Sequence, residues 1–337
     1  MSVTTSAAQE RERWLARTIE EPIEPGEPIC DPHHHLWIFP DSRYLVEELL
    51  ADFGGHRVVR TVFVECHQAY LSDGPPQLQP VGETKFVAAM AGSHGRPDGV
   101  TQVAAGIVGF ADLTQGAGVR EVLDAHRAAS PAFRGIRYAT AWDASPQIRR
   151  SHTGAPAGLL ADRRFREGFA CLREGGFVFD AWAYHPQLPE VVDLARAFPD
   201  VTIVLDHAGG PLGIGPYAGR CDDVYALWRE RIIELSRCEN VVVKLGGLTM
   251  TMSGHGWHRR ESPPGSAEVA AAIGPYVHTC IEHFGTARCM FESNFPVDRA
   301  SCSYIVLWNA YKRLIRGCSR AERAALLHDT AVRIYRL

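Results

Sequence analysis

Eight apolar segments of strand length recur along this 337-residue chain, and their spacing constrains the fold more than any other feature. Most are β-branched or continuously apolar, as strands buried on both faces of a parallel sheet must be. Amphipathic segments typical of helices lie between them, for example 187–198 and 222–238. Eight strand and helix units in alternation predict a closed (β/α)8 TIM barrel of the α/β class. The strand candidates are 28–35, 58–66, 102–113, 133–139, 177–184, 201–209, 241–248 and 287–296.

The barrel is expected to form a single domain over residues 28–337, after an N-terminal extension over residues 1–27. Two Gly- and Pro-rich loop insertions, 209–220 and 251–265, follow the sixth and seventh strands, so we expect them over the C-terminal face of the barrel. An open doubly wound sheet is the competing architecture, but it usually carries a Gly-rich phosphate-binding turn after its first strand. Histidines occupy that turn here, which favours the barrel.

Nearly every predicted strand ends in a side chain that can bind a metal, donate a hydrogen bond or titrate. In a parallel barrel these ends converge on one face, where barrel enzymes carry their active sites. A set in register with eight strands therefore predicts one shared site. Its members are His33, His35, Glu65, His67, Asp112, Arg137, His185, Asp206, His207, Lys244 and Asn294.

The first of these strand ends carries a His-x-His pair, His33 and His35. Side chains two apart on a strand face the same way, so both imidazoles can reach one point. Neutral imidazoles are common ligands of divalent transition metals, which makes the pair a candidate metal clamp. A polar turn rich in histidine is the alternative for this segment taken alone.

Composition and charge exclude several other classes of protein. The 35 basic and 39 acidic residues are well mixed and give a formal charge of −4, so no basic stripe for nucleic acid is present. The first 24 residues contain no long apolar stretch, and we expect neither export nor membrane insertion. Nine cysteines without a Cys-x-x-Cys pair favour reduced thiols. We therefore expect a cytoplasmic protein with a small-molecule substrate, and a homo-oligomer stays open.

Several ordered motifs give this chain a family resemblance from Cys30 onward. The chain resembles the amidohydrolase-related (amidohydrolase 2 type) metal-dependent hydrolases, most closely the branch of sugar lactonases and pyrone dicarboxylate lactonases. The resemblance implies that His33, His35 and His207 are metal ligands and that His185 matches a further site histidine. The motifs are Asp31-Pro32-His33-His34-His35-Leu36-Trp37, Phe133-Arg134-Gly135-Ile136-Arg137, His185-Pro186-Gln187-Leu188-Pro189, Val204-Leu205-Asp206-His207-Ala208-Gly209, Asn240-Val241-Val242-Val243-Lys244-Leu245-Gly246-Gly247 and Met290-Phe291-Glu292-Ser293-Asn294-Phe295-Pro296.

At the end of the eighth strand the chain departs from the pattern that it resembles. The family usually has Ser-Asp-Trp-Pro, whose Asp orients the attacking water and takes its proton, whereas this chain reads Ser293-Asn294-Phe295-Pro296. An amide cannot serve as that base, and the loss of an anionic ligand weakens metal binding. Glu292 lies on the same strand side as Asn294 and is an inward-pointing carboxylate, a solvated charge or a partner of Arg288.

The remaining candidates each have a structural alternative. Glu65 closes an apolar run and is expected to be paired, bound to a ligand or at the site. Arg137 suits a clamp on a substrate carboxylate or carbonyl, or a structural ion pair. Lys244 is either a buried salt-bridge partner or a donor to a developing oxyanion. Trp182 is a further candidate for substrate contact.

These observations predict a hydrolase that opens a lactone or related ester of a small acidic or oxygenated molecule. In the metal version a divalent ion, zinc or manganese, polarises the carbonyl, and His185 or Glu65 manages the proton while Asn294 orients water or substrate. In a metal-independent version the histidines donate hydrogen bonds and a carboxylate activates water. A metal-dependent decarboxylase of the same family and a catalytically impaired accessory homologue are the alternatives.

Overall fold

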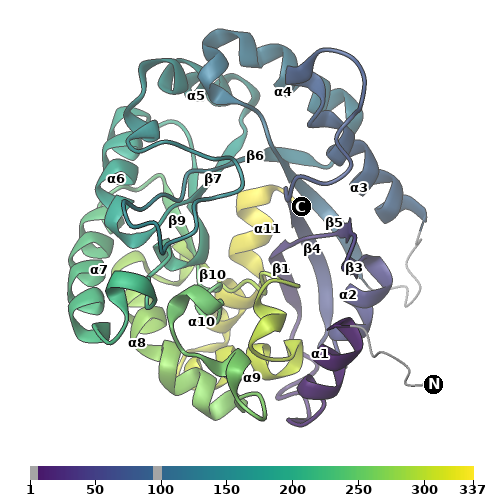
Figure 1. Ribbon diagram of the computed structural model, residues 1–337, viewed down its shortest axis with the longest axis vertical. Coiled ribbons are helices and arrows are strands. Elements are labelled where there is room, and N and C mark those ends of the chain that lie inside the picture. Colours follow the sequence, from purple (N-terminus) through teal and green to yellow (C-terminus); the bar gives the residue numbers. More distant parts are fainter. Residues whose placement is uncertain (1–6, 94–100) are drawn as a thin grey trace.

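The computed structural model describes residues 7–93 and 101–337, and its centre is one sheet of eight parallel strands (Figure 1). The strands pair in sequence order, each with the next one. The chain that follows the last strand returns to the first through a parallel bridge between His34 and Phe295, which closes the barrel. The strands are β1 (Ile29–His34), β4 (Val58–Val64), β5 (Gln102–Gly109), β6 (Phe133–Ala139), β7 (Val178–Trp182), β8 (Ile203–Leu205), β9 (Val241–Lys244) and β10 (Cys289–Met290).

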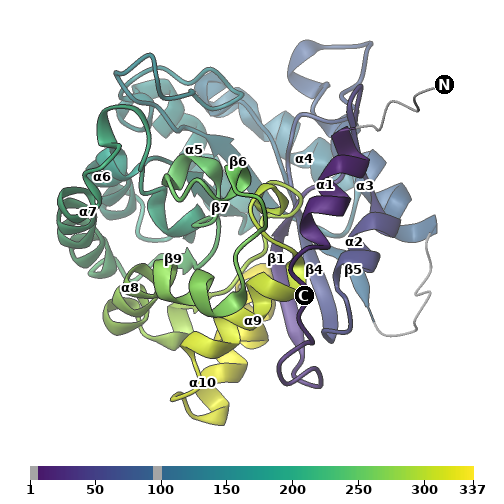
Figure 2. The same cartoon turned by 60° about the horizontal axis from the view of Figure 1, so that its bottom comes forward.

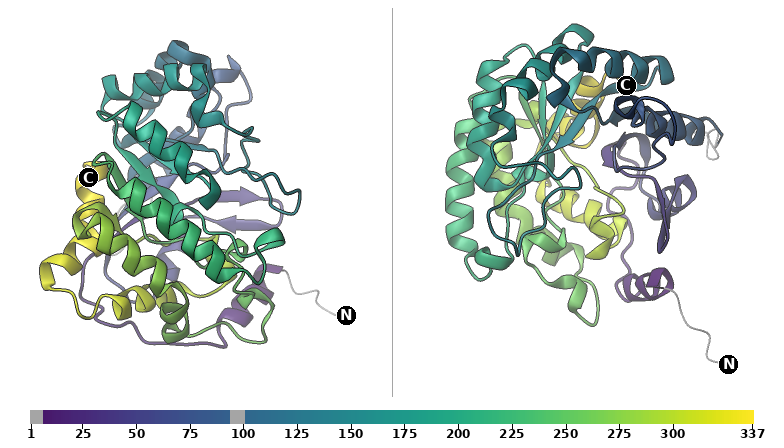
Figure 3. Two further views of the ribbon diagram at one scale, coloured as in Figure 1. Left: turned by 90° about the vertical axis from the view of Figure 1, so that its left-hand side faces the viewer. Right: turned by 45° about the horizontal axis from the view of Figure 1, so that its top comes forward.

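Helices surround the strands, as both views of Figure 3 show, and the predicted (β/α)8 barrel is confirmed. All eight predicted strands are present, although most are shorter than their apolar segments. A small antiparallel hairpin, β2 (Trp37–Phe39) and β3 (Ser42–Tyr44), follows β1. The α-helices are α1 (Ala7–Leu15), α2 (Val46–Asp52), α3 (Val81–Ser93), α4 (Val119–Ala129), α5 (Arg163–Gly175), α6 (Leu188–Ala197), α7 (Cys221–Ser236), α8 (Ser266–Phe284), α9 (Tyr304–Leu314), α10 (Arg320–Ala324) and α11 (Thr330–Tyr335).

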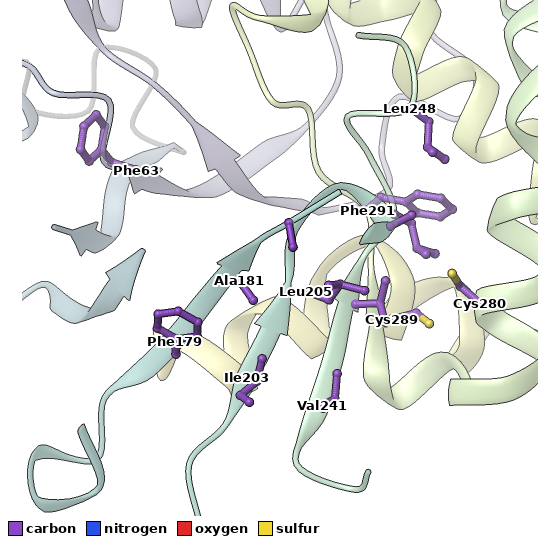
Figure 4. Packing of buried hydrophobic residues seen from close by; sticks show 14 of the residues in the cluster. Phe63, Phe179, Ala181, Ile203, Leu205, Val241, Leu248, Cys280, Cys289 and Phe291 are labelled. Atoms are coloured by element: carbon purple, nitrogen blue, oxygen red, sulfur yellow. The ribbon is translucent and has the colours of Figure 1, made fainter. Parts of the chain in front are cut away.

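Alternation along the strands divides the apolar side chains between two cores. Phe179 and Ala181 of β7 point outward and pack in the layer between strands and helices (Figure 4). Val178, on the other face of the same strand, belongs to the barrel interior with valines from its neighbours. The strand residues are nearly all buried on both faces, which explains why their sequences are mostly apolar.

Helix α11 lies within the ring of strands in the view of Figure 1. Its residues Ala331 and Tyr335 pack in the same cluster as Cys30 and Val178, which come from the beginnings of β1 and β7. The helix therefore closes the barrel at the end opposite the candidate site.

The N-terminal extension runs along one side of the barrel (Figure 2). Trp14 Nε1 donates to the Arg260 carbonyl at 2.9 Å, and Lys312 Nζ of α9 donates to the Ile23 carbonyl at 2.9 Å. These bonds fix the extension to the 251–265 insertion and to α9. Its first six residues lie outside the described residues, and the domain boundary at residue 28 stays a prediction.

No helix in the described part of the chain is both long and apolar enough to cross a bilayer.

Candidate active site at the C-terminal ends of the strands

Most of the side chains predicted at the strand ends meet in the barrel. Each of the central ones is at most 5% exposed, so the group lies well below the molecular surface. The members joined by direct contacts are His33, His35, Glu65, Arg137, Asp206, His207, Lys244 and Asn294.

His33, Asp206 and His207 form the one group of potential metal ligands found among the described residues. Each offers a ligand atom, and these atoms lie within 4.8 Å of one another. The ring centroids of His33 and His207 are 4.6 Å apart. His207 has a left-handed backbone (φ 56°) just after β8, where the strand turns into a short 3-10 segment. We call these three residues the histidine–aspartate cluster.

Two fixed cations lie against this cluster. Lys244 Nζ is 2.6 Å from Asp180 Oδ2, 3.0 Å from Asp206 Oδ1 and 3.1 Å from His33 Nδ1. Burial lowers the pKa of Lys244, but Asp180 and Asp206 outweigh it and raise the pKa, so the ammonium is charged. The Lys244 side chain is fully buried and makes the salt bridges that one of its two sequence alternatives predicted.

Arg137 is held mainly by Glu65. Its Nε donates to Glu65 Oε1 at 2.7 Å and its Nη2 donates to the Glu65 carbonyl, which leaves Nη1 at 3.3 Å from His33 Nε2. The other oxygen of Glu65 lies 3.0 Å from His152 Nε2. Burial raises the pKa of Glu65, but Arg137 and His152 together lower it to about 2. Glu65 is therefore an ionised anchor for both side chains.

Charge and unmet hydrogen bonds in this region fit a bound cation. Four buried carboxylates and two fixed cations are linked by contacts, which leaves two excess negative charges when the histidines are neutral. Neither oxygen of Asp206 receives a well-aligned hydrogen bond from a described residue, although Lys244 is close to one of them. Uncompensated charge is costly to bury, so a divalent ion would stabilise this arrangement. The carboxylates are Glu65, Asp180, Asp206 and Glu292, and the cations are Arg137 and Lys244.

His35 lies beside the histidine–aspartate cluster but is not one of its members. Its Nδ1 is bonded to the Val64 carbonyl at 2.8 Å, and its Nε2 is 3.3 Å from Asn294 Oδ1. Burial, with Arg137, lowers the pKa of His35 to about 3, so the ring is neutral. Asp206 takes the third place in the cluster. The sequence predicted it at a strand end but did not assign it as a metal ligand.

Asn294 is tied to a buried carboxylate. Its Nδ2 donates to Asp298 Oδ2 at 2.5 Å, and Asp298 also accepts from the backbone NH and hydroxyl of Thr249. Burial raises the pKa of Asp298 to about 6. The backbone of Asn294 is left-handed (φ 55°), which asparagine tolerates better than most residues. Asn294 thus holds the turn after β10 as well as facing His35.

His185 and Trp182 lie at the end of β7. The rings of Trp182 and His207 are nearly perpendicular, with centroids 4.7 Å apart, and Trp182 is half-buried. His185 packs against Tyr217, accepts from the Leu212 NH at 3.4 Å, and contacts none of the cluster residues within the described chain. Burial lowers the pKa of His185 to about 4.

Besides His185, two predicted strand-end residues lie outside the group. His67 is exposed and stacks on Tyr70, and Asp112 caps the segment after β5 by accepting from the Thr114 NH. Both side chains come from loops beyond the strands, where alternation no longer fixes direction.

Sequence reasoning did not assign three residues that the structure places here. Asp180 is a lone carboxylate inside an apolar run, in phase with the inward-facing Val178, so alternation could have found it. Glu292 points inward and is not the partner of Arg288, whose hydrogen bonds within the described residues all go to backbone carbonyls. His152 belongs to a long loop and carries no local signal.

Comparison with known proteins gives consistent results. A family model described as Amidohydrolase matches residues 30–337. The uncharacterized protein y4mH of Sinorhizobium fredii is 33% identical over 338 residues, which cover 92% of this chain and 98% of that protein. An L-fucono-1,5-lactonase of Burkholderia multivorans is 32% identical over 180 residues, which cover 53% of this chain and 58% of the lactonase.

Among solved structures, an amidohydrolase from Burkholderia multivorans with bound zinc is similar over 92% of this chain and 99% of its own. The TM-score is 0.72 at 25% identity. The match of the family model to nearly the whole barrel, together with the geometry of the strand ends, shows that this chain is a hydrolase and belongs to the amidohydrolase family.

Proposed function

We propose that this chain is a metal-dependent lactonase that opens the cyclic ester of a small oxygenated or acidic molecule. The observation that carries the proposal is the buried histidine–aspartate cluster with excess negative charge around it. The lactonase relative supports the type of reaction, and the zinc in the similar amidohydrolase supports zinc as the ion, with manganese as the alternative.

His33, Asp206 and His207 would hold the ion. Bound there, a divalent ion supplies Lewis acidity to an ester carbonyl and makes water a better nucleophile near neutral pH. Lys244 Nζ contacts Asp206 Oδ1 at 3.0 Å and His33 Nδ1 at 3.1 Å, and so fixes the positions of both side chains. We therefore assign Lys244 a positioning role in place of direct substrate contact.

Ester opening also needs a group that accepts and returns a proton. We propose His185 for this role, because it is neutral at pH 7 and its buried Nε2 has no hydrogen-bond partner among the described residues. Asn294 would orient water or substrate through its amide oxygen beside His35. Glu65, with both oxygens engaged, contributes by holding Arg137 and His152.

Substrate contact is proposed for Trp182 and for Nη1 of Arg137. Trp182 places an aromatic surface beside His207, which suits the apolar face of a sugar ring. Nη1 is the Arg137 nitrogen that is free of Glu65, and it faces the cluster. A single charge-assisted hydrogen bond to a carbonyl or hydroxyl is within its reach.

The direct test is a substrate panel on purified, zinc-loaded protein. The panel holds sugar 1,5-lactones, with L-fucono-1,5-lactone among them, 2-pyrone-4,6-dicarboxylate and an aromatic carboxylic acid. We expect ring opening, followed by acid release, for at least one lactone and no loss of carbon dioxide from the aromatic acid. Decarboxylation without lactone opening would contradict the proposal. The His33→Ala/His207→Ala double variant, which lacks both cluster imidazoles, is the control.

A further inference from the structure

Glu292 touches both imidazoles of the histidine–aspartate cluster at once. It lies two residues after the end of β10 and is fully buried. Its Oε1 accepts from His207 Nδ1 at 2.7 Å and from the His207 backbone NH at 3.1 Å, while its Oε2 lies 2.8 Å from His33 Nδ1. One carboxylate therefore faces the same ring atom of two histidines.

The bond to Oε1 determines where the His207 ring carries its hydrogen. Oε1 accepts from both the ring Nδ1 and the backbone NH of His207, so Glu292 acts as a hydrogen-bond acceptor at this point. An Nδ1 that faces such an acceptor carries the hydrogen, and the Nε2 of the neutral ring then keeps its lone pair. Metal-ligating histidines are typically held in this way, with the other ring nitrogen donating to a carboxylate.

Lys244 is the one neighbour that would favour the opposite arrangement at His33, since its ammonium can only donate and lies 3.1 Å from Nδ1. Its donors are already engaged by Asp180 at 2.6 Å and by Asp206 at 3.0 Å. The carboxylate of Glu292 lies closer to His33 Nδ1, at 2.8 Å, but its Oε2 receives no well-aligned hydrogen bond from a described residue, so the directed hydrogen bond of Glu292 is the one to His207.

The loop after β9 leaves room for these two side chains. A Cβ on Gly246 would lie 2.3 Å from Cγ of Glu292, and a Cβ on Gly247 would lie 2.4 Å from Cγ of His207. Gly247 also has a left-handed backbone (φ 62°). A larger residue at either glycine would therefore occupy the space that the side chains of Glu292 and His207 need.

We propose that Glu292 is a positioning residue that contacts both imidazoles of the cluster and holds the hydrogen of His207 on Nδ1, which leaves the His207 Nε2 lone pair for a cation. The inference rests on the proposed function for the identity of the cation ligands. It extends that function by naming the carboxylate that touches both ligand rings and sets the hydrogen position of His207.

Glu292→Gln is the sharpest test, because the amide keeps the size of the side chain but offers only one oxygen to two rings. We expect the variant to bind zinc about 10- to 100-fold more weakly, the usual effect of losing such a partner. Competition with a chelator measures this affinity without any substrate. Asp298→Asn is the matched control, since it removes a buried carboxylate that contacts neither ring, and its affinity should equal that of the parent.

Nitrogen-15 spectra of the histidine rings in metal-free protein give a second, independent measurement. In the parent, His207 should carry hydrogen on Nδ1, and in Glu292→Gln the signals of the His207 ring should change. If Glu292→Gln does not fold, Gly246→Ala displaces the same carboxylate and should weaken zinc binding in the same direction.

The outcomes separate this inference from the proposed function. Equal zinc affinity and unchanged ring spectra in Glu292→Gln would overturn the role of Glu292. A parent that binds no zinc, but whose ring spectra change in the variant, would refute the metal in the proposed function and leave the positioning role in place.

Discussion

At the scale of single residues, Asn294 is an amide in a turn where a carboxylate would be repelled by a second buried carboxylate, Asp298. Its Nδ2 donates to Asp298 at 2.5 Å, and its Oδ1 faces His35 Nε2 at 3.3 Å. Asp298 is already a costly buried acid, with a pKa raised to about 6 by burial. A neutral partner that donates a hydrogen bond therefore stabilises this pair.

We predict that Asn294→Asp lowers stability and brings no gain in lactone hydrolysis. Two buried carboxylates in contact repel, so one of them must take up a proton or the turn must open. The loss of the hydrogen bond should lower the free energy of unfolding by about 1 to 3 kcal/mol. Denaturant unfolding and initial rates at several pH values measure the two effects.

Asn309→Asp is a control for that experiment. Asn309 is equally buried, on α9, and donates to Glu20, so the change again brings two carboxylates together but far from the cluster. A rise in activity of roughly 10²- to 10⁴-fold in Asn294→Asp, the range of a positioned general base, would instead mean that the parent lacks its base.

At the scale of elements, α11 is connected to the active site through the barrel interior. The Tyr335 hydroxyl donates to Asp180 Oδ2 at 2.8 Å, and the same oxygen lies 2.6 Å from Lys244 Nζ. Lys244 in turn contacts Asp206. A helix that closes the opposite end of the barrel thus supports the residues below the cluster.

Tyr335→Phe should lower the free energy of unfolding by about 1 to 2 kcal/mol, because Asp180 loses a buried hydrogen bond while the ring packing remains. Tyr44→Phe is the matched control. Tyr44 also donates to a carboxylate at 2.8 Å, but its acceptor Asp52 keeps two contacts from Arg299. Urea unfolding of both variants should show the larger loss for Tyr335→Phe, and an equal or smaller loss would contradict the connection.

At the scale of the whole molecule, the barrel was predictable because its strands are buried on both faces. The apolar runs 62–64 and 241–243 are typical of such strands. The closure of the barrel was harder to predict from the sequence. It depends on Phe295, which lies in the turn after the short strand β10 and belongs to no regular strand.

The candidate site was predictable where strand alternation fixes the direction of a side chain. His33, Arg137 and Lys244 illustrate this, since each is at or near a strand end and points into the barrel. Alternation fails once the chain leaves the strand, as at His67 and His152. The sequence could not predict that Asp206, and not His35, belongs to the cluster. That outcome depends on the hydrogen-bond partners of the His35 ring nitrogens, which come from other strands of the barrel.

The most direct test of the account is the dependence of lactone opening on a divalent ion in the intact protein. Protein stripped with a chelator should be inactive on the lactone identified by the panel, and activity should return as zinc is added, saturating near about one ion per chain. The His33→Ala/His207→Ala variant should stay inactive and bind no zinc at this site. Full activity of the stripped protein, or equal zinc binding by the variant, would contradict the account.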